Sequence, residues 1–235
     1  MSTFLTGVQD LATECGLKSY PTSVTSQVGE FARLVTWYKD AWIEIQNRTN
    51  WKWLRHEFTL NTVADDGIYS YSDCTDSETS SAITRFDSWR FTDQNDPPKI
   101  YLQSTGVGGE RWLTYTPWDW FKSIYLIGSQ TTNTGAPAHI SVDPLYRIHI
   151  GPVPDAVYVI TGDYYLSPQI LSAGSDTPEM PAHFHKLIVY EAMKQYGYHE
   201  VAQEVLTRAS INSKKMMRQL EKNQGPTWQI GGPLV

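Results

Sequence analysis

The side chains in this sequence that could bind a metal ion are its histidines and a run of acidic residues. His183 and His185 lie two positions apart and would point to different faces of a helix, and His199 has no second histidine four residues on. The acidic run from Asp65 to Glu78 lacks the spacing of a calcium loop, which needs a glycine at its sixth position and a glutamate at its end. The sequence therefore predicts surface or capping histidines, a solvated acidic loop, no metal site and no cofactor.

Motifs for phosphate binding and for nucleophilic catalysis are missing from the sequence. The glycine loop Gly106–Gly109 is not followed by a Lys-Ser or Lys-Thr pair, and no serine lies in a nucleophile-elbow context. The run Trp118–Phe121 could stack on a sugar, although a packed corner between strands fits it better. The sequence therefore predicts a protein that is not an enzyme, with a hydrolase of unrecognised site as a weaker alternative.

Composition excludes several further classes of protein. The formal net charge of −6 argues against a protein that binds nucleic acid through phosphate contacts, which needs a basic face. No apolar run reaches membrane-spanning length, and the first residues lack the basic lead and long apolar run of a signal peptide. Nine tryptophans and 14 tyrosines indicate large buried or interfacial aromatic surfaces.

The two cysteines lie in unlike settings. Cys15 falls on the face of an expected helix and Cys74 in a polar loop, so neither a disulfide framework nor a metal cluster is predicted. Together with the absence of a leader, this favours a soluble protein made in a reducing cytosol.

Helical periodicity dominates the first 50 residues. A first helix is expected from a cap at Ser2 or Thr3 to a stop at Gly16. A second is expected from near Ser26 to the region 47–50, because its apolar residues recur at helical spacing. These predicted core residues are Phe31, Leu34, Tyr38, Trp42 and Ile45.

The middle of the chain changes to strand-like patterns. Residues 51–60 alternate in polarity and predict a strand, and 64–81 predict an exposed loop or hairpin. Extended segments follow at 83–91, 99–103, 111–115, 138–142, 145–150 and 156–166, with a short helix at 116–127 and a flexible loop at 128–137. Asp143 and Pro144 predict a turn, and Gly162 a β-bulge.

A long, interrupted helix is expected near the C-terminus. Asp176 or Thr177 would cap its start, Gly197 would mark a kink or a short break, and Gly225 would end it in a left-handed cap before Pro226. The apolar stripes of this segment supply the remaining predicted core residues, Leu187, Ile188 and Val205.

These patterns predict an α+β fold. Residues 1–50 and 168–224 would form one helical bundle, 51–167 an inserted antiparallel β lobe, and 225–235 an extended C-terminal arm.

The expected arm has no charged side chain but several apolar ones. A frayed terminus is the alternative interpretation of this segment. Burying each large side chain is worth roughly 1.5–3 kcal/mol, so we expect the arm to dock onto a neighbouring subunit through Trp228, Ile230, Leu234 and Val235. Just before it, four cations form a basic patch: Lys214, Lys215, Arg218 and Lys222. Their first interpretation is a favourable interaction with the negative end of the helix, and their second is contact with an acidic partner.

The order of features resembles a known family. The features are Glu14-Cys15-Gly16, then Gly29-Glu30, Leu34–Trp37 and Ala41–Gln46 in the second helix, Trp51–Leu54 after it, Gly151–Asp155, Gly162–Tyr165, Pro178–Pro181, Phe184–Tyr190 and Gly231–Leu234. Together they are similar to the head-to-tail adaptor, or connector, proteins of tailed bacteriophages, a group broadly similar to the tail tubular protein of short-tailed phages. The resemblance covers most of the chain.

The resemblance implies a function and a set of partners. Such adaptors combine a helical bundle with a β lobe, form a ring of usually twelve copies beneath the portal protein, extend the DNA channel and contact the next tail or stopper component. Their C-terminal arms reach onto the portal, which assigns Trp228, Ile230 and Leu234 here as anchors. DNA would pass without specific binding and no membrane would be involved. The protein would lie in the virion neck after assembly in the host cytoplasm.

Two points stand apart from this resemblance. The segment Ala64–Phe91 is longer than expected for the family, which leaves open which loop meets the tail. The rival function from another class is a carbohydrate-binding or receptor-binding tail component, which would use the aromatic residues of the β lobe.

Overall fold

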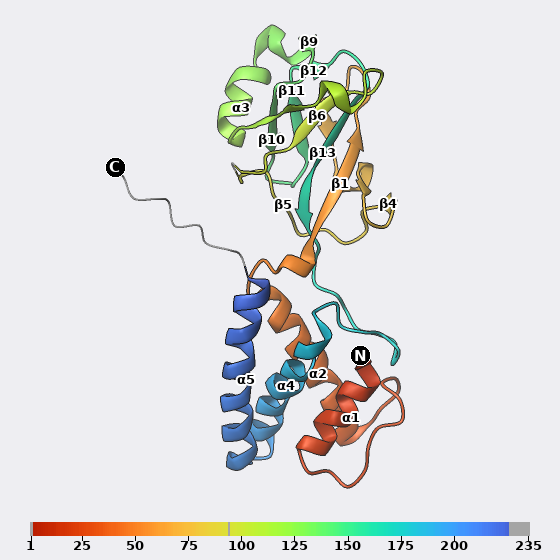
Figure 1. Cartoon of the computed structure of the whole chain (residues 1–235), viewed down its shortest axis with the longest axis vertical. Coiled ribbons are helices and arrows are strands. Elements are labelled where there is room, and N and C mark those ends of the chain that lie inside the picture. The colour runs from red at the N-terminus through yellow and green to blue at the C-terminus, as the bar shows by residue number, and fades with distance from the viewer. Residues whose placement is uncertain (1, 94, 226–235) are drawn as a thin grey trace, which may run out of the picture. The chain divides into compact units, whose positions relative to one another are not determined.

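A computed structural model describes residues 2–93 and 95–225. It forms two compact units, one made of the residues up to Trp53 and from Pro168 onward, the other of Leu54–Ser167. Figure 1 shows that the first is helical and the second is built mainly of strands. The predicted α+β fold class is confirmed.

The helical unit is built from four α-helices and a short 3₁₀ turn. They are α1 (Phe4–Glu14), α2 (Gly29–Asn47), η5 (Ala182–Phe184), α4 (Lys186–His199) and α5 (Gln203–Gln224). The predicted start of α1 is confirmed, because the Thr3 side chain accepts a hydrogen bond from Thr6 N at 3.3 Å. Gly16 follows α1 in the left-handed region at φ +79°, where glycine carries no penalty.

Helix α4 is the centre of this unit. It packs against α1, α2 and α5, and it is buried around much of its circumference. Of the residues predicted from sequence to form this core, six are buried and two, Phe31 and Val205, are half-buried. The six are Leu34, Tyr38, Trp42, Ile45, Leu187 and Ile188.

The predicted interruption of the C-terminal helix is present as a short break, but it lies at Glu200–Ala202, three residues after Gly197. Gly197 is helical, and a Cβ there would lie 3.0 Å from Leu206 Cβ and 3.1 Å from the Leu206 backbone. The glycine is therefore required because the first turn of α5 folds back onto the end of α4. Ala202 N donates to Gly197 O at 3.0 Å across this turn.

Both predicted caps of this helix are wrong. Asp176 does not cap α4; its carboxylate accepts the backbone N–H groups of Ser172 and Ala173 at 2.7 and 2.8 Å and closes a local turn. Gly225 is extended (φ −71°, ψ 164°), not left-handed. A Cβ at Gly225 would lie 2.4 Å from Glu221 O, so glycine is needed here for space.

The β unit contains a seven-stranded sheet, a four-stranded sheet and a two-stranded pair. The large sheet holds β1 (Arg55–Asn61), β3 (Thr75–Asp76), β4 (Ser81–Ala82), β5 (Ser88–Trp89), β6 (Lys99–Leu102), β7 (Arg111–Trp112) and β13 (Tyr158–Tyr165). The second holds β2 (Ile68–Tyr69), β8 (Thr114–Tyr115), β10 (His139–Val142) and β11 (Ile148–Gly151), and the pair is β9 (Thr134–Gly135) with β12 (Val153–Pro154). Helix α3 spans Trp118–Tyr125, within the predicted helical segment.

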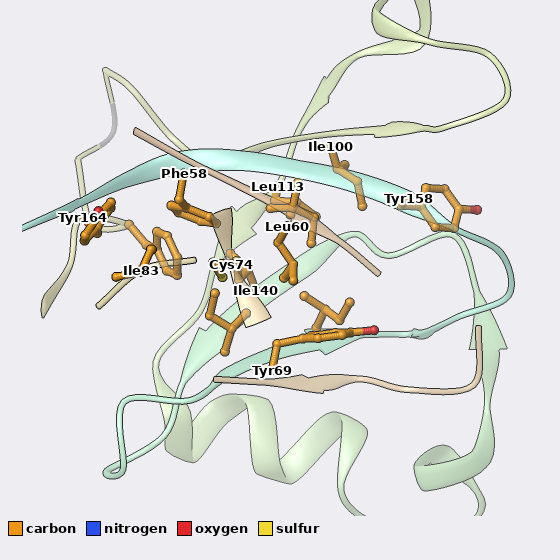
Figure 2. Packing of buried hydrophobic residues seen from close by; sticks show 14 residues of the cluster. Phe58, Leu60, Tyr69, Cys74, Ile83, Ile100, Leu113, Ile140, Tyr158 and Tyr164 are labelled. Atoms are coloured by element: carbon orange, nitrogen blue, oxygen red, sulfur yellow. The ribbon is translucent and has the colours of Figure 1, made fainter. Parts of the chain in front are cut away.

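Side chains from both larger sheets meet in one core. Figure 2 shows Phe58 and Leu60 of β1 with Ile100 of β6 on one side, and Tyr69 of β2 with Ile140 of β10 on the other. The central pair is β1 with β13, which run antiparallel in continuous register from Arg55↔Tyr165 to Asn61↔Val159. Most pairings in the unit are antiparallel, and β8–β10 and β9–β12 are parallel.

Two strand predictions are corrected by the structure. Gly162 pairs directly with Phe58, so no bulge interrupts β13; a Cβ there would lie 3.1 Å from the Phe58 ring, which explains the glycine. Trp51 and Trp53 precede β1 in an irregular segment and the 3₁₀ turn η1 (Lys52–Leu54). Their rings stack at 4.7 Å, so their alternation reflects this stacking rather than a strand.

The region 64–81 is more structured than predicted. The short strands β2, β3 and β4 and the 3₁₀ turn η2 (Tyr71–Asp73) lie within it or overlap its end. Cys74 and Asp76 are buried, so the description of this region as a solvated acidic loop is wrong at these two positions. At the turn after β10, Asp143 Oδ1 accepts Leu145 N and Arg147 N at 2.8 and 2.9 Å, which confirms the predicted turn.

Candidate interaction surfaces

Helix α5 presents a basic face away from the helical core. Its buried residues, Ala209, Ser213, Met217 and Leu220, lie on the side that packs against α4. Lys214, Lys215, Arg218 and Lys222 are exposed on the other side. Their spacing of one, three and four residues places them along about two turns of one helix face.

None of these four cations forms an ion pair within the described residues. Other cations of the same unit do, as Arg48 Nε lies 3.1 Å from Glu221 Oε1 and Lys186 Nζ lies 2.8 Å from Glu14 Oε1. Arg208, earlier on α5, also contacts Glu14. The four cations of this basic face therefore have no ion-pair partner among the residues that the structure describes.

The first half of α5 lines a hollow on the surface of the helical unit. Gln203, Thr207, Arg208 and Ile211 are among the residues that line about 480 Å³ of open space. Ile211 is 63% exposed, although full burial of such a side chain is worth roughly 1.5–3 kcal/mol. This exposed apolar residue was not singled out from the sequence, and its position among polar residues is the only signal that could have marked it.

The predicted anchors Trp228, Ile230, Leu234 and Val235 lie outside the described residues. The last described position, Gly225, is extended and follows α5 directly. The basic face ends at Lys222, three positions before it. Sequence alone thus places the apolar segment next to the unpaired cations.

Charge is divided unequally between the two units. Leu54–Ser167 carries 14 of the 25 acidic residues and 7 of the 19 basic ones, a formal net charge of −7. The rest of the chain carries the remaining 11 acidic and 12 basic residues, a net charge of +1. The negative net charge of the whole chain, −6, therefore comes from the β unit.

The main clusters of titratable residues in the β unit form internal hydrogen bonds that stabilise its fold. Asp76 accepts hydrogen bonds from Tyr164 Oη at 2.6 Å, His56 Nδ1 at 2.8 Å and the N–H groups of Glu78 and Thr79. Burial by itself would raise the pKa of Asp76, but these donors outweigh it and lower the pKa to about 2. Such a carboxylate, with each oxygen already bonded, is a structural centre rather than a proton-transfer group.

Two further clusters have the same character. Asp143 binds Arg147 and lies 3.2 Å from His149 Nε2, and burial lowers the pKa of His149 despite that carboxylate. Asp163 accepts from Arg55 Nε at 2.7 Å and from Arg90 Nη1 at 2.8 Å. The first cluster stabilises the turn between β10 and β11, and the second joins β13 to Arg55 of β1.

His185 and His199, which were considered as metal ligands from the sequence, form hydrogen bonds with neighbouring residues in the structure. His185 is buried and bridges Ser2 Oγ at 3.1 Å and Met180 O at 3.0 Å, while His199 lies between Arg33 and Glu200. Within the described ranges, no group of three or more His, Cys, Asp or Glu residues is placed to hold a metal ion. In the same ranges, no helix has the length and apolar character needed to cross a bilayer.

The two cysteines lie in different units of the protein. Cys15 lies in the helical unit and Cys74 in the β unit, and both are free and buried. Burial raises the pKa of each thiol to about 12, which leaves almost no reactive thiolate at neutral pH.

Most aromatic rings of the β unit pack against one another. Phe86 stacks on Tyr71 with centroids 5.0 Å apart and also contacts Trp89 at 4.6 Å. In the run considered for sugar stacking, Trp118 packs on His149 at 4.5 Å, which makes this tryptophan part of a packed corner. Trp120, by contrast, is 45% exposed.

One groove in the β unit does carry exposed aromatic surface. Trp112 and Tyr115 line about 530 Å³ of open space together with Thr92, Thr114 and other polar residues. Trp112 is 56% exposed, and Lys99 Nζ lies 5.2 Å from its ring centroid. This groove is the feature that a sugar-binding function would use.

Comparison with known proteins identifies the family. Curated proteins give no match. The family model described as SU10 adaptor protein matches residues 3–234, which is nearly the whole chain. The agreement extends over both units, so it does not depend on one local motif. The chain therefore belongs to the SU10 adaptor protein family and is a structural adaptor of the bacteriophage virion.

Proposed function

We propose that the protein is a non-catalytic component of the phage neck. Twelve copies form a ring that joins the portal protein to the tail and extends the DNA channel. The observation that carries this proposal is the match to the adaptor family over residues 3–234. The commitment of Asp76, Asp143 and Asp163 to internal hydrogen bonds supports a role without catalysis.

The contact with the portal or a neighbouring copy is assigned to the C-terminal segment and the basic face. The segment 226–235 has no charged side chain, and Trp228, Ile230 and Leu234 are its apolar anchors, with Val235 at the end. Burying the three anchors would contribute roughly 1.5–3 kcal/mol each. Lys214, Lys215, Arg218 and Lys222 precede this segment and supply the charged part of the contact.

The passage of DNA without specific binding is consistent with the distribution of charge. The β unit carries a net charge of −7, and a surface that repels phosphates lets a duplex slide. The next tail or stopper component completes the set of partners, and the ring is a component of the virion neck, assembled in the host cytoplasm.

A truncation that removes residues 226–235 tests the portal contact. Binding of the ring to isolated portal particles is measured by co-sedimentation, with full-length protein and Gln229→Ala as controls. Loss of three anchors corresponds to at least about a thousandfold weaker binding. A truncated chain that assembles and binds the portal like the full-length protein contradicts the assignment.

The groove lined by Trp112 and Tyr115 favours one alternative, a carbohydrate-binding or receptor-binding tail component. Aromatic faces with polar neighbours suit sugar rings. Titration of the protein with host surface glycans, followed by tryptophan fluorescence, distinguishes the two functions. A saturable change that Trp112→Ala abolishes, in a protein that never forms a ring, would replace the adaptor function with this one.

A further inference from the structure

The outward face of α2 carries two carboxylates that complement the cations of α5. Asp40 and Glu44 are exposed and lie four residues apart, so they are neighbours on one side of the helix. The buried residues of α2, among them Leu34, Tyr38 and Trp42, are on the other side. Neither carboxylate forms an ion pair within the residues that the structure describes.

A hollow beside Glu44 has room for a long basic side chain. It encloses about 380 Å³ and is lined by residues of α2, α4 and α5 together with Arg48, which follows α2. Two of its charged residues are already engaged, because Arg48 pairs with Glu221, and Glu191 accepts from Lys194 Nζ at 2.6 Å and also binds Ser213. Glu44 is the charged residue of this hollow that has no such partner among the described residues.

The acidic and basic faces lie at the same level of the helical unit. The Arg48–Glu221 ion pair joins the end of α2 to the last turn of α5. Glu44 is one turn before Arg48, and Lys222 follows Glu221 directly. Copies arranged side by side around an axis parallel to these helices would therefore bring one copy's cations level with the next copy's carboxylates.

The two faces also point in different directions. The cations lie on the side of α5 turned away from its buried residues Ala209, Ser213 and Met217. Asp40 and Glu44 lie on the side of α2 turned away from its buried residues. A contact that joins them therefore uses two different faces of each copy.

We propose that the basic face of α5 binds the acidic face of α2 on the adjacent copy. Lys214, Arg218 and Lys222 would lie against Asp40 and Glu44, with one cation in the hollow beside Glu44. This contact joins two different faces, so it is heterologous and closes into a ring when the rotation is right. The inference rests on the proposed ring and names the residues that join its copies.

Duplex DNA is the other partner that a basic stripe could bind. It fits less well, because the unit that carries these four cations has a formal net charge of only +1, whereas a protein held on DNA by phosphate contacts needs a strongly basic face. The two acidic residues of α2 have no role in such a complex, whereas the contact between copies uses both faces.

Zero-length cross-linking tests the contact directly. Equal amounts of ¹⁵N-labelled and unlabelled full-length protein are mixed, treated with a carbodiimide, and digested for mass spectrometry. Cross-links of mixed isotope are expected between Lys214 or Lys222 and Asp40 or Glu44. Mixed-isotope cross-links at other positions alone overturn the proposal, as does protection of the four cations by duplex DNA without any cross-link between copies.

Charge reversal provides the matched variants. One variant carries Lys214→Glu, Arg218→Glu and Lys222→Glu, and the other carries Asp40→Lys and Glu44→Lys. Each alone should associate at least about tenfold more weakly than wild type in sedimentation velocity runs, since like charges then oppose each other. A 1:1 mixture should recover wild-type assembly, because each variant's α5 is complementary to the other's α2.

Recovery in the mixture also shows that both variants are folded. If both variants assemble like wild type, this contact is wrong while the ring, and with it the proposed function, stands. If wild-type protein forms no ring either alone or with the portal, the proposed function itself fails.

Discussion

The replacement of Asp76 by asparagine tests how much one buried charge contributes to the stability of the β unit. The side chain of Asp76 is 6% exposed, and its oxygens accept four hydrogen bonds, from Tyr164, His56, Glu78 and Thr79. Asn keeps the size of the side chain but replaces one oxygen with an NH₂ group that faces donors. Removing the charge therefore removes the interactions that lower the pKa of Asp76 to about 2.

The size of the effect follows from that pKa. The difference between the ordinary value of 3.8 and about 2, at about 1.4 kcal/mol per pKa unit, corresponds to about 2 kcal/mol of folding stability. Because the folded-state pKa is the lower one, this stability is present above pH 4 and is lost as the pH falls toward 2. At pH 3 about half of it remains.

Urea unfolding followed by near-UV circular dichroism measures this difference. Asp76→Asn should lower the unfolding free energy of the β unit by about 2 kcal/mol at pH 7 and by about 1 kcal/mol at pH 3. Glu57→Gln, an exposed change on β1, is the control and should stay within about 0.5 kcal/mol of wild type at both values. An equal loss at pH 7 and pH 3 would refute the electrostatic origin of the effect.

Three further substitutions and one chemical modification have expected outcomes. Tyr38→Phe should leave the stability unchanged or raise it by up to about 1 kcal/mol, because the buried Tyr38 hydroxyl has no hydrogen-bond partner among the described residues. Tyr164→Phe should lower the stability by about 1–3 kcal/mol, because the Tyr164 hydroxyl donates to Asp76. Thermal melts of both variants check these opposite signs. Gly162→Val should destabilise the β unit by at least about 2 kcal/mol, because a Cβ would lie 3.1 Å from the Phe58 ring, and native-like urea curves would contradict this. Both thiols should resist iodoacetamide at pH 8 for as long as the protein is folded, given that burial raises their pKa to about 12, and rapid alkylation of native protein would count against their burial.

Several features of the protein follow from the sequence alone. The periodicity from Phe31 to Ile45 predicts α2, because a helix that must bury one face repeats its apolar residues every three or four positions. The Asp143 turn follows from local chemistry, since the carboxylate can reach the N–H two residues on. The family resemblance was also recoverable from spaced motifs, and the match over residues 3–234 confirms it.

Other features were decided by tertiary contacts. The sequence suggests a bulge at Gly162, but this glycine is present because Phe58 of the neighbouring strand approaches its backbone. The sequence also suggests an interruption at Gly197, but the packing of Leu206 against this glycine accompanies a break at Glu200–Ala202 instead. The acidic run around Asp76 is polar in composition, yet its buried position depends on Tyr164, 88 residues away.

The basic face shows the same division between local and tertiary information. The spacing of Lys214, Arg218 and Lys222 is visible in the sequence, and so is that of Asp40 and Glu44. Whether these charges are matched within the unit depends on how α2, α4 and α5 pack, because an ion pair requires two side chains within about 4 Å. Local patterns therefore determined the helices and their charged stripes, and only the packing around α4 left those stripes available for another copy.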